Sequence, residues 1–457
     1  MSKQYLRRFW SALDSRRATY IFLGFGLLLR VAALCVGGSG ALRNEAPGYY
    51  QTALQLLHQE GFSPYWPPGL PYYLYVIQRV FGESILVARA SILPFYILFS
   101  VFLYRLARLI TSRKAANLAV LVFAIYPPYI RYAFNPSTEY PAAAFLLGGL
   151  YFAIGASRAR SVGWAVAVGL CLGVLSLIRP SSVLFVLVVP IYFLLNIKQV
   201  RMAFVPVAVC SLLIAVWLVK AHSLTGRWVL INEANSENLF FGNNPYTPLF
   251  RTWPEGQAEI GFPAEFRELL RRIRNESDEV RGHLYRQIAL RHIFSRPDLF
   301  FLRTLNRMRA YFGFPVHHGE PLWRYLGWIK PRWLLPLGLT ALDVTFYWPI
   351  MALAIVCAFH HKFGLIRGDP VVAILGAALV YAMPYWVTFS QPRFNFPVVP
   401  LLAILAVKFL DQWTQGPREQ DFGLLPAPWK RKAALLGALS LFAYIQLEWI
   451  AVFYLRV

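Results

Sequence analysis

Residues 162–220 read VGWAVAVGLCLGVLSLIRPSSVLFVLVVPIYFLLNIKQVRMAFVPVAVCSLLIAVWLVK. Three apolar runs lie here, at 162–178, 181–196 and 201–220, and only short segments with Arg, Lys or Pro separate them. A helix needs about 17–25 apolar residues to cross the hydrocarbon core of a bilayer. The runs lack the alternation of barrel strands, and a helix satisfies its own backbone hydrogen bonds in lipid. This stretch therefore predicts a bundle of membrane-spanning helices.

The same pattern recurs along the chain of 457 residues. Apolar residues make up 57% of it and charged residues 15%, against about 45–50% and about 25% in a soluble domain. We therefore expect an all-α polytopic integral membrane protein with about eleven spans, and an ordinary soluble enzyme is excluded. The first run is long and lacks a small-residue cleavage site, so we expect a retained span rather than a signal peptide. The spans are expected near 18–38, 84–106, 115–131, 140–156, 162–178, 181–196, 201–220, 333–358, 370–389, 394–411 and 433–454.

Lysine and arginine follow a regular pattern around these spans. Groups of them precede the first and last spans and follow the second, fourth, sixth and eighth, and these groups fall on one side, which we take as the cytoplasm. The net charge of +23 then indicates basic inner loops and anionic lipid or phosphate ligands rather than nucleic acid. On the opposite, outer side we expect the segments 39–83, 132–139, 221–332 and 390–393.

This topology divides the chain into three parts. Residues 1–220 form an N-terminal transmembrane module, residues 221–332 an outer loop domain, and residues 333–457 a C-terminal transmembrane module. The outer loop domain has the composition of a soluble domain and predicts helices at 264–276, 278–294 and 299–312, the last of them interfacial. Residues 412–429 are rich in polar residues and proline and are expected to form an inner linker.

The first outer loop reads RNEAPGYYQTALQLLHQEGFSPYWPPGLPYYLYVIQRVFG over residues 43–82. An apolar stripe after Glu45 predicts one short helix, four prolines force an extended turn, and a second amphipathic helix follows at 72–81. This loop is expected to lie on the membrane surface, where partial loss of water would raise the basicity of Glu45. On the residues alone, the commoner role for an acid at this place is a helix cap.

The residues of this loop and of four later segments resemble GT-C membrane glycosyltransferases, and within them the protein O-mannosyltransferase and aminoarabinose-transferase group. The loop carries E-A-x-x-Y-x-x-x-A-L from Glu45, then P-P-G-x-P, then F-G, where the family typically opens with aspartate. The later similar elements are Asn135-Pro136-Ser137-Thr138-Glu139, Leu177-Ile178-Arg179-Pro180, Gly242-Asn243-Asn244-Pro245 and Gln391-Pro392-Arg393-Phe394-Asn395-Phe396-Pro397.

The resemblance implies an inverting transfer of a sugar from a polyprenyl-phosphate carrier to a glycan, lipid or protein acceptor at the outer face of a bacterial inner membrane. It implies Glu45 as general base, Glu139 as second acid, and Arg393 and Arg179 as the residues that hold the donor phosphate. Tyr49, Tyr50, Asn243 and Asn244 are the implied substrate-binding residues. No cofactor is expected, and no metal site is assigned.

Each of these residues has an alternative interpretation. Glu139 could cap a helix, Arg393 could anchor a span end at the interface, and Arg179 could hydrogen-bond between helices. For the whole chain, a lipid-linked sugar transporter or a non-catalytic scaffold would also explain the spans and the arginines. A transporter is disfavoured because the acids fall on one side and no internal repeat is visible.

Overall fold

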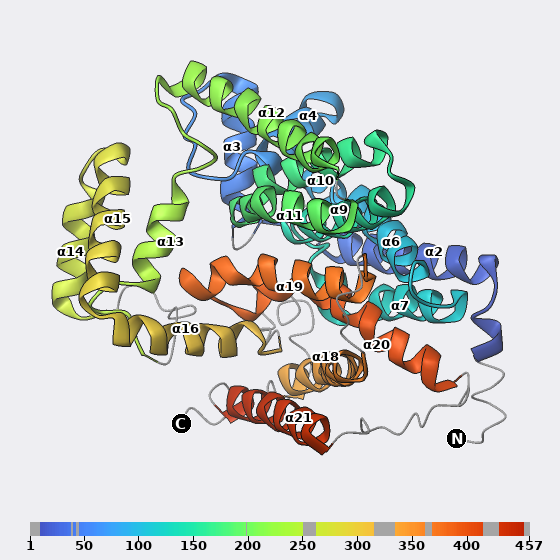
Figure 1. The fold of residues 1–457 in the computed structure, drawn as a ribbon. Helices are drawn as coiled ribbons and strands as arrows, with labels where there is room; N and C mark the ends of the chain where they lie inside the picture. Colours follow the sequence, from blue (N-terminus) through green and yellow to red (C-terminus); the bar gives the residue numbers. More distant parts are fainter. Residues whose placement is uncertain are drawn as a thin grey trace.

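The computed structural model describes residues 10–37, 40–42, 45–197, 199–249, 262–314, 334–361, 368–414 and 429–451. Within these ranges every regular element is an α-helix or a 3₁₀-helix (Figure 1). The prediction of an all-α fold is therefore confirmed. Most of the predicted linker at 412–429 lies outside the described residues.

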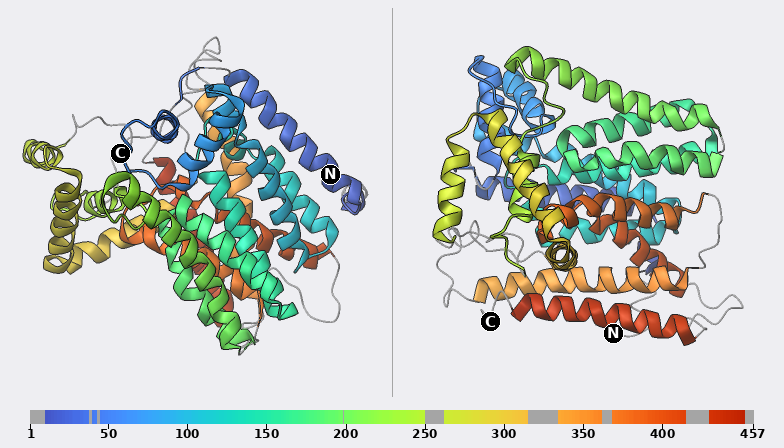
Figure 2. Two further views of the ribbon diagram at one scale, coloured as in Figure 1. Left: turned by 90° about the horizontal axis from the view of Figure 1, so that it is seen from above. Right: turned by 60° about the vertical axis from the view of Figure 1, so that its left-hand side comes forward.

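Long helices packed side by side form the body of the molecule. In the N-terminal half these helices are α2 (Arg16–Gly37), α6 (Leu93–Arg108), α7 (Arg113–Ile125), α9 (Glu139–Ala159), α10 (Val162–Ile178), α11 (Phe185–Ile197) and α12 (Val200–Thr225), and the short α5 (Ile85–Ala90) precedes α6. In the C-terminal half they are α18 (Leu334–His360), α19 (Pro370–Val387), α20 (Val399–Thr414) and α21 (Trp429–Ile450). Figure 2 shows the same bundle from two further directions.

Among the described residues, seven helices are long and apolar enough to cross a membrane. They are Arg16–Cys35, Ile85–Arg108, Glu139–Ala159, Val200–Thr225, Thr340–His360, Pro370–Val387 and Trp429–Ile450. Two shorter apolar helices occupy Val162–Ile178 and Pro180–Asn196. The polytopic prediction is confirmed, whereas the number of eleven spans is not.

The predicted span at 115–131 is divided into two helices. The helix α7 ends at Ile125, Tyr126 has an extended backbone with ψ of 116°, and α8 (Pro127–Arg131) follows. Proline disfavours a helical conformation in the residue before it, and Pro127 and Pro128 lack the N–H groups that would continue α7. The chain therefore changes direction at Tyr126, just before the segment that carries Glu139.

The two segments that we expect on the outer side and for which we predict helices, called here the first and second outer segments, lie at one end of the bundle (Figures 1 and 2). The first contains α3 (Ala46–His58) and α4 (Gly69–Phe81). The second contains α13 (Ala234–Gly242), α14 (Ala264–Arg274), α15 (Asp278–Ser295) and α16 (Pro297–Tyr311). The last three helices begin and end within two residues of all their predicted limits. The helices α14 and α15 lie across the bundle end rather than along it.

A small apolar core of its own holds the second outer segment together. It contains Phe240, Phe241, Phe266, Leu270, Ile273, Tyr285 and Ala289. The buried Arg307 on α16 ties this segment to the bundle, because its guanidinium donates to the carbonyl oxygens of Val387 (2.7 Å), Trp386 (3.2 Å) and Gly242. The helix α13 is thereby held beside the end of α19.

Candidate active site

A cavity of about 440 Å³, lined by both charged and aromatic side chains, opens at this end of the bundle. Its walls come from the first outer loop, the end of α10, the start of α13, and the segment between α19 and α20. The lining residues are Glu45, Tyr49, Tyr65, Trp66, Pro67, Ile178, Arg179, Pro180, Ser181, Asn232, Ala234, Asn235, Glu237, Asn238, Pro384, Tyr385, Thr388, Phe389, Gln391, Arg393 and Phe394. Segments that are far apart in the sequence therefore meet around one space.

Glu45 and Arg393 form an ion pair within this cavity, although 348 residues separate them in the chain. Arg393 lies in a short 3₁₀-helix, Pro392–Asn395, that begins after the extended residue Gln391. Tyr49, one helical turn after Glu45, donates its hydroxyl to Oε2 of Glu45 at 3.3 Å. Glu45 stands at the N-cap position of α3, yet its side chain makes no capping hydrogen bond. The capping alternative is therefore wrong in this structure.

The environment of Glu45 lowers its pKa below the ordinary value of 4.5. Burial alone raises the pKa, but the positive charges of Arg393 and Arg179 and the hydrogen bonds from Arg393 and Tyr49 lower it more. Our expectation of raised basicity is thus wrong for the ligand-free site, because the sequence did not show that two guanidinium groups face the carboxylate. The carboxylate is ionised at neutral pH and is held by its cationic partner.

Glu139 and Arg179 form a second ion pair at 2.8 Å, and both side chains are largely buried. Glu139 is the first residue of α9, and Arg179 follows α10 with an extended backbone that Pro180 favours. Glu139 is therefore no N-cap, while the alternative of a hydrogen bond between helices describes what Arg179 does here. The carboxylate of Glu139 also acts on Arg393: burial lowers the pKa of Arg393, but Glu45 and Glu139 raise it more.

Glu45, Arg179 and Arg393 therefore line the cavity, and the buried Glu139 lies outside its lining as the partner of Arg179. The buried Nε atoms of Arg179 and Arg393 have no hydrogen-bond partner among the described residues. Buried donors normally find a partner, so these two donors are unsatisfied in the ligand-free protein. Within the described part of the chain, no three His, Cys, Asp or Glu residues are placed to hold a metal ion.

The four residues implied to bind substrate have different positions. Tyr49 lines the cavity, whereas Tyr50 does not and packs against the main core. Asn243 and Asn244 are buried outside the cavity lining and hydrogen-bond within the protein. Asn243 donates to the carbonyl oxygen of Val387 (2.9 Å) and accepts from Arg307 (3.0 Å), and Asn244 donates to the carbonyl oxygen of Phe240 (3.0 Å). The structure thus does not bring Tyr50, Asn243 and Asn244 to the acid–arginine cluster.

Sequence reasoning missed two parts of the cavity. One is an aromatic floor, where Trp66 lies 4.7 Å from the ring of Tyr49 and 5.0 Å from that of Tyr65. A Cβ atom at Gly48 would overlap the indole of Trp66, so glycine is required there. The other is a group of asparagines with Glu237 at the start of α13. The run NEANSEN at 232–238, polar in an apolar chain, was the available signal.

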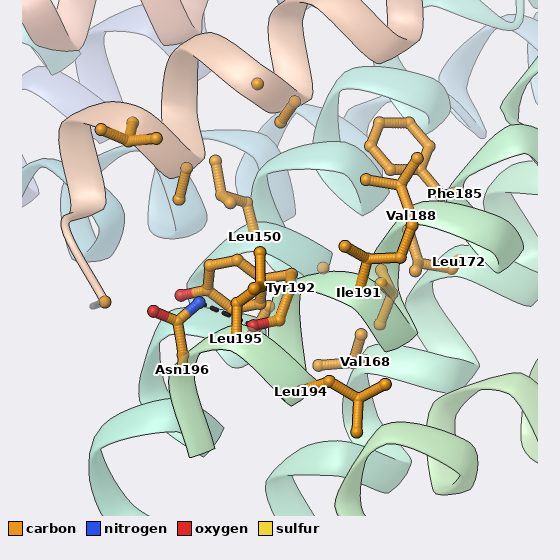
Figure 3. Close-up of a pocket in the computed structure, with 18 of the residues that line it drawn as sticks. Leu150, Val168, Leu172, Phe185, Val188, Ile191, Tyr192, Leu194, Leu195 and Asn196 are labelled. Carbon is orange, nitrogen blue, oxygen red and sulfur yellow. Dashed lines mark hydrogen bonds between the residues drawn. The ribbon is translucent and has the colours of Figure 1, made fainter. Parts of the chain in front are cut away.

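A second cavity, of about 700 Å³, lies between α9, α10, α11 and α19 and is mainly apolar. Figure 3 shows Phe185 at one end and Asn196 at the other, with side chains of α11 between them. The side chain of Asn196 donates to the carbonyl oxygen of Tyr192 at 2.6 Å. Because η1 (Pro180–Leu184) directly precedes α11, one short segment joins the lining of this cavity to Arg179.

Comparison with known proteins gives one family match. Residues 66–220 match the family model described as dolichyl-phosphate-mannose-protein mannosyltransferase. This segment includes Glu139 and Arg179 and leaves Glu45 and Arg393 outside. A search of curated proteins finds no match.

Solved structures of an oligosaccharyltransferase from the archaeon Archaeoglobus fulgidus are similar over 94% of this chain but over only 55% of their own length. The apo form has a TM-score of 0.49 at 16% identity. The form in complex with an inhibitory peptide and a dolichol-phosphate has a TM-score of 0.45 at 14% identity. The chain thus spans about half the length of these proteins. It is the family match over residues 66–220 that confirms the predicted resemblance to GT-C membrane glycosyltransferases.

Proposed function

We propose that this protein transfers a sugar from a polyprenyl-phosphate carrier to an acceptor at the outer face of the membrane. The observation that carries the proposal is a cavity at the end of an apolar helix bundle, lined by the ion pair of Glu45 with Arg393 and by Arg179, which pairs with the buried Glu139. The family match supports the class of reaction and of donor. The acceptor class stays open between glycan, lipid and protein.

The two arginines would hold the phosphate of the donor. A guanidinium group binds two phosphate oxygens at once, and both Arg179 and Arg393 line the cavity and have an Nε donor without a partner among the described residues. A phosphate whose charge is held in this way leaves without a general acid. The arginines therefore act on the leaving phosphate, and the acids remain to act on the acceptor hydroxyl.

Glu45 would act as the general base once the donor has bound. When Arg393 turns to the phosphate, the carboxylate loses its main partner and its pKa rises toward the value that a base requires. The hydroxyl of the acceptor then passes its proton to Glu45 while its oxygen forms a bond to the anomeric carbon. The bond from that carbon to the phosphate oxygen breaks, and the phosphate keeps the electron pair. Attack from the face opposite the phosphate inverts the configuration.

The apolar cavity along α11 would receive the tail of the carrier. Its lining is mainly Leu, Val, Ile and Phe, and only Asn196, Tyr192 and Asp369 bring polar groups to it. A polyprenyl tail is a pure hydrocarbon and gains from contact with such a surface. The segment of Ser181 to Phe185 would then lead from the phosphate site to the tail site.

The proposal also fixes an orientation, with the cavity on the outer face of the bacterial inner membrane. A cysteine introduced at Ser277, which is exposed on the outer segment, should react with an impermeant thiol reagent in intact cells, in a background where the exposed Cys35 is replaced by serine. A cysteine at Ala159, at the other end of α9, should react only after the membrane is opened. Protection of the Ser277→Cys site in intact cells would contradict the orientation.

Purified protein and a polyprenyl-phosphate sugar provide the direct test of function. A transferase releases free polyprenyl phosphate in the presence of an acceptor, whereas a transporter of lipid-linked sugars moves its substrate across a vesicle membrane unchanged. We expect release that depends on Glu45. Movement of intact donor without any release of polyprenyl phosphate would contradict the proposal in favour of the transporter alternative.

A further inference from the structure

One wall of the acid–arginine cavity comes from the start of α13. We call Asn232, Asn235, Glu237 and Asn238 the amide wall. Asn235 and Asn238 are three residues apart and therefore lie on the same side of the helix. Phe240 and Phe241, further along α13, are buried in the core of the outer segment with Phe266. Burial of these rings fixes the rotation of α13, and its polar side thereby faces the cavity.

The amide wall has hydrogen-bonding groups that the protein itself does not use. Asn232 donates to the carbonyl oxygen of Tyr65 at 3.2 Å, but its own buried Oδ1 has no partner among the described residues. The side chains of Asn235, which is exposed, and Asn238, which is half-buried, make no hydrogen bond to another described residue. Glu237 accepts from the hydroxyl of Tyr65 at 2.6 Å through Oε2, and its other oxygen makes no such bond within the same ranges. A buried acceptor without a partner is costly, so a ligand that supplies one is favoured.

The chemistry of these groups indicates hydroxyl groups as their partners. An amide both donates and accepts, and a carboxylate accepts, which matches groups that can do both. Residues 232–238 contain no Lys or Arg, so this wall offers no charge to a phosphate. A hydrocarbon tail would leave every one of the polar groups unpaired. The rings of Trp66 and Tyr65 beside them offer an apolar surface to the C–H groups of the same ligand.

We propose that the amide wall is a carbohydrate subsite, in which the asparagines and Glu237 bind the hydroxyls of one sugar ring that packs on Trp66. This inference rests on the proposed glycosyl transfer and extends it by naming the residues that bind the sugar hydroxyls. The ring can come from the donor or from a glycan acceptor, because both present the same hydroxyl chemistry to this wall.

Binding measurements on the full chain in lipid nanodiscs test the subsite without requiring turnover. The probes are polyprenyl phosphate alone and polyprenyl phosphate carrying mannose, glucose or galactose. The variants are Asn238→Ala and Asn232→Ala, and the matched control is Ser236→Ala, because Ser236 lies on α13 but outside the cavity lining. Loss of one hydrogen bond to a sugar hydroxyl should weaken binding of the best sugar-bearing carrier by about 3-fold to 10-fold. Binding of polyprenyl phosphate alone should not change.

A second arm of the experiment distinguishes the source of the sugar. Glu45→Gln protein, which cannot turn over by the proposed mechanism, is saturated with the best sugar-bearing carrier, so that the donor sugar position is filled. It is then titrated with methyl mannoside, methyl glucoside or methyl galactoside, which are left with the acceptor position. If the asparagine variants bind the methyl glycoside more weakly in this arm, the acceptor sugar lies at the amide wall. If they bind the sugar-bearing carrier more weakly in the first arm, the donor sugar lies there.

Two results would overturn the subsite. One is unchanged binding of every sugar-bearing probe in both asparagine variants. The other is an equal loss for polyprenyl phosphate alone, which would give the asparagines a purely structural role. If the wild type transfers sugar but the asparagine variants bind sugar normally, the subsite is refuted and the transfer is not. If the wild type binds sugar through the amide wall but never releases polyprenyl phosphate, the transfer is refuted and the subsite is not.

Discussion

Replacement of Glu45 by glutamine is the sharpest test of the proposed mechanism. The amide keeps the size of the side chain and can still accept a hydrogen bond from Arg393, but it cannot take a proton from the acceptor. Loss of a general base lowers the rate by about 10²–10⁴-fold. At about 1.36 kcal/mol for each tenfold change, this corresponds to an increase of about 2.7–5.5 kcal/mol in the activation free energy. Expression and folding should be nearly normal.

The effect on stability follows from the exposure of the ion pair. The side chains of Glu45 and Arg393 are 33% and 27% exposed, so water screens their attraction. The loss in free energy of unfolding should therefore be about 1 kcal/mol rather than the 3–5 kcal/mol of a fully buried pair. Glu448→Gln is a matched control, because Glu448 pairs with Arg309 at 3.4 Å with similar exposure, 24% and 20%, outside the cavity lining.

The assay measures release of polyprenyl phosphate and the thermal unfolding midpoint for the wild type and both variants. We expect a similar small shift in the midpoint for the two variants and a large loss of rate only for Glu45→Gln. Glu45→Asp keeps a carboxylate one methylene shorter and should retain part of the activity. A Glu45→Gln enzyme that turns over at the wild-type rate would refute Glu45 as the base, and Glu139 would be the next candidate.

Three further predictions concern the same end of the bundle. Arg393→Lys should raise the KM for the donor by about 10-fold or more, because a point charge cannot hold two phosphate oxygens. The control is Arg296→Lys, because Arg296 forms an exposed ion pair with Asp298. Unchanged donor kinetics in Arg393→Lys would exclude Arg393 from the site. The pKa of Glu45 is lowered in the free protein, so kcat/KM should fall only below about pH 4.5. In the donor-bound protein Arg393 pairs with the phosphate instead of Glu45, so the pKa of Glu45 is higher and kcat should begin to fall at a higher pH. If kcat and kcat/KM fall at the same pH, Arg393 does not exchange partners in this way. Gly242→Ala should lower the free energy of unfolding by about 1–3 kcal/mol, because its Cβ would overlap the carbonyl oxygen of Thr388, while Gly282→Ala, with open space around it, should have no such effect in the same thermal measurement.

The parts of the fold that follow from local sequence were predictable. Apolar runs determine where the long helices lie, and Pro127 shows why one run was divided, since a proline inside an apolar run interrupts a helix without interrupting the hydropathy. The number of spans was not predictable in this way, because α7 and α20 have only 13 and 16 residues. An apolar run alone does not distinguish a short span from a packed core helix.

The site was predictable only where a local motif carried it. Glu45, Glu139, Arg179 and Arg393 each lie in a recognisable element, and the structure brings all four together. The pairing itself was not visible, because it depends on contacts between distant segments, and so the direction of the pKa shift of Glu45 was wrong. Asn243 and Asn244 belong to a motif that holds α13 against α19, whereas the nearby Asn235 and Asn238 belong to none and line the cavity.

The ion pair of Glu45 and Arg393 also has a consequence for how the protein is made. Chains are synthesised at about 5–20 residues per second, so Arg393 leaves the ribosome roughly 20–70 s after Glu45. During that interval the carboxylate of Glu45 lacks its main cation, and the cavity lacks one side. A nascent chain interrupted before residue 393 would therefore carry nearly the whole membrane bundle and still be unable to hold a phosphate between two guanidinium groups. If the two arginines hold the donor phosphate as proposed, the order of synthesis alone keeps a partly made chain from holding the lipid-bound donor in this way.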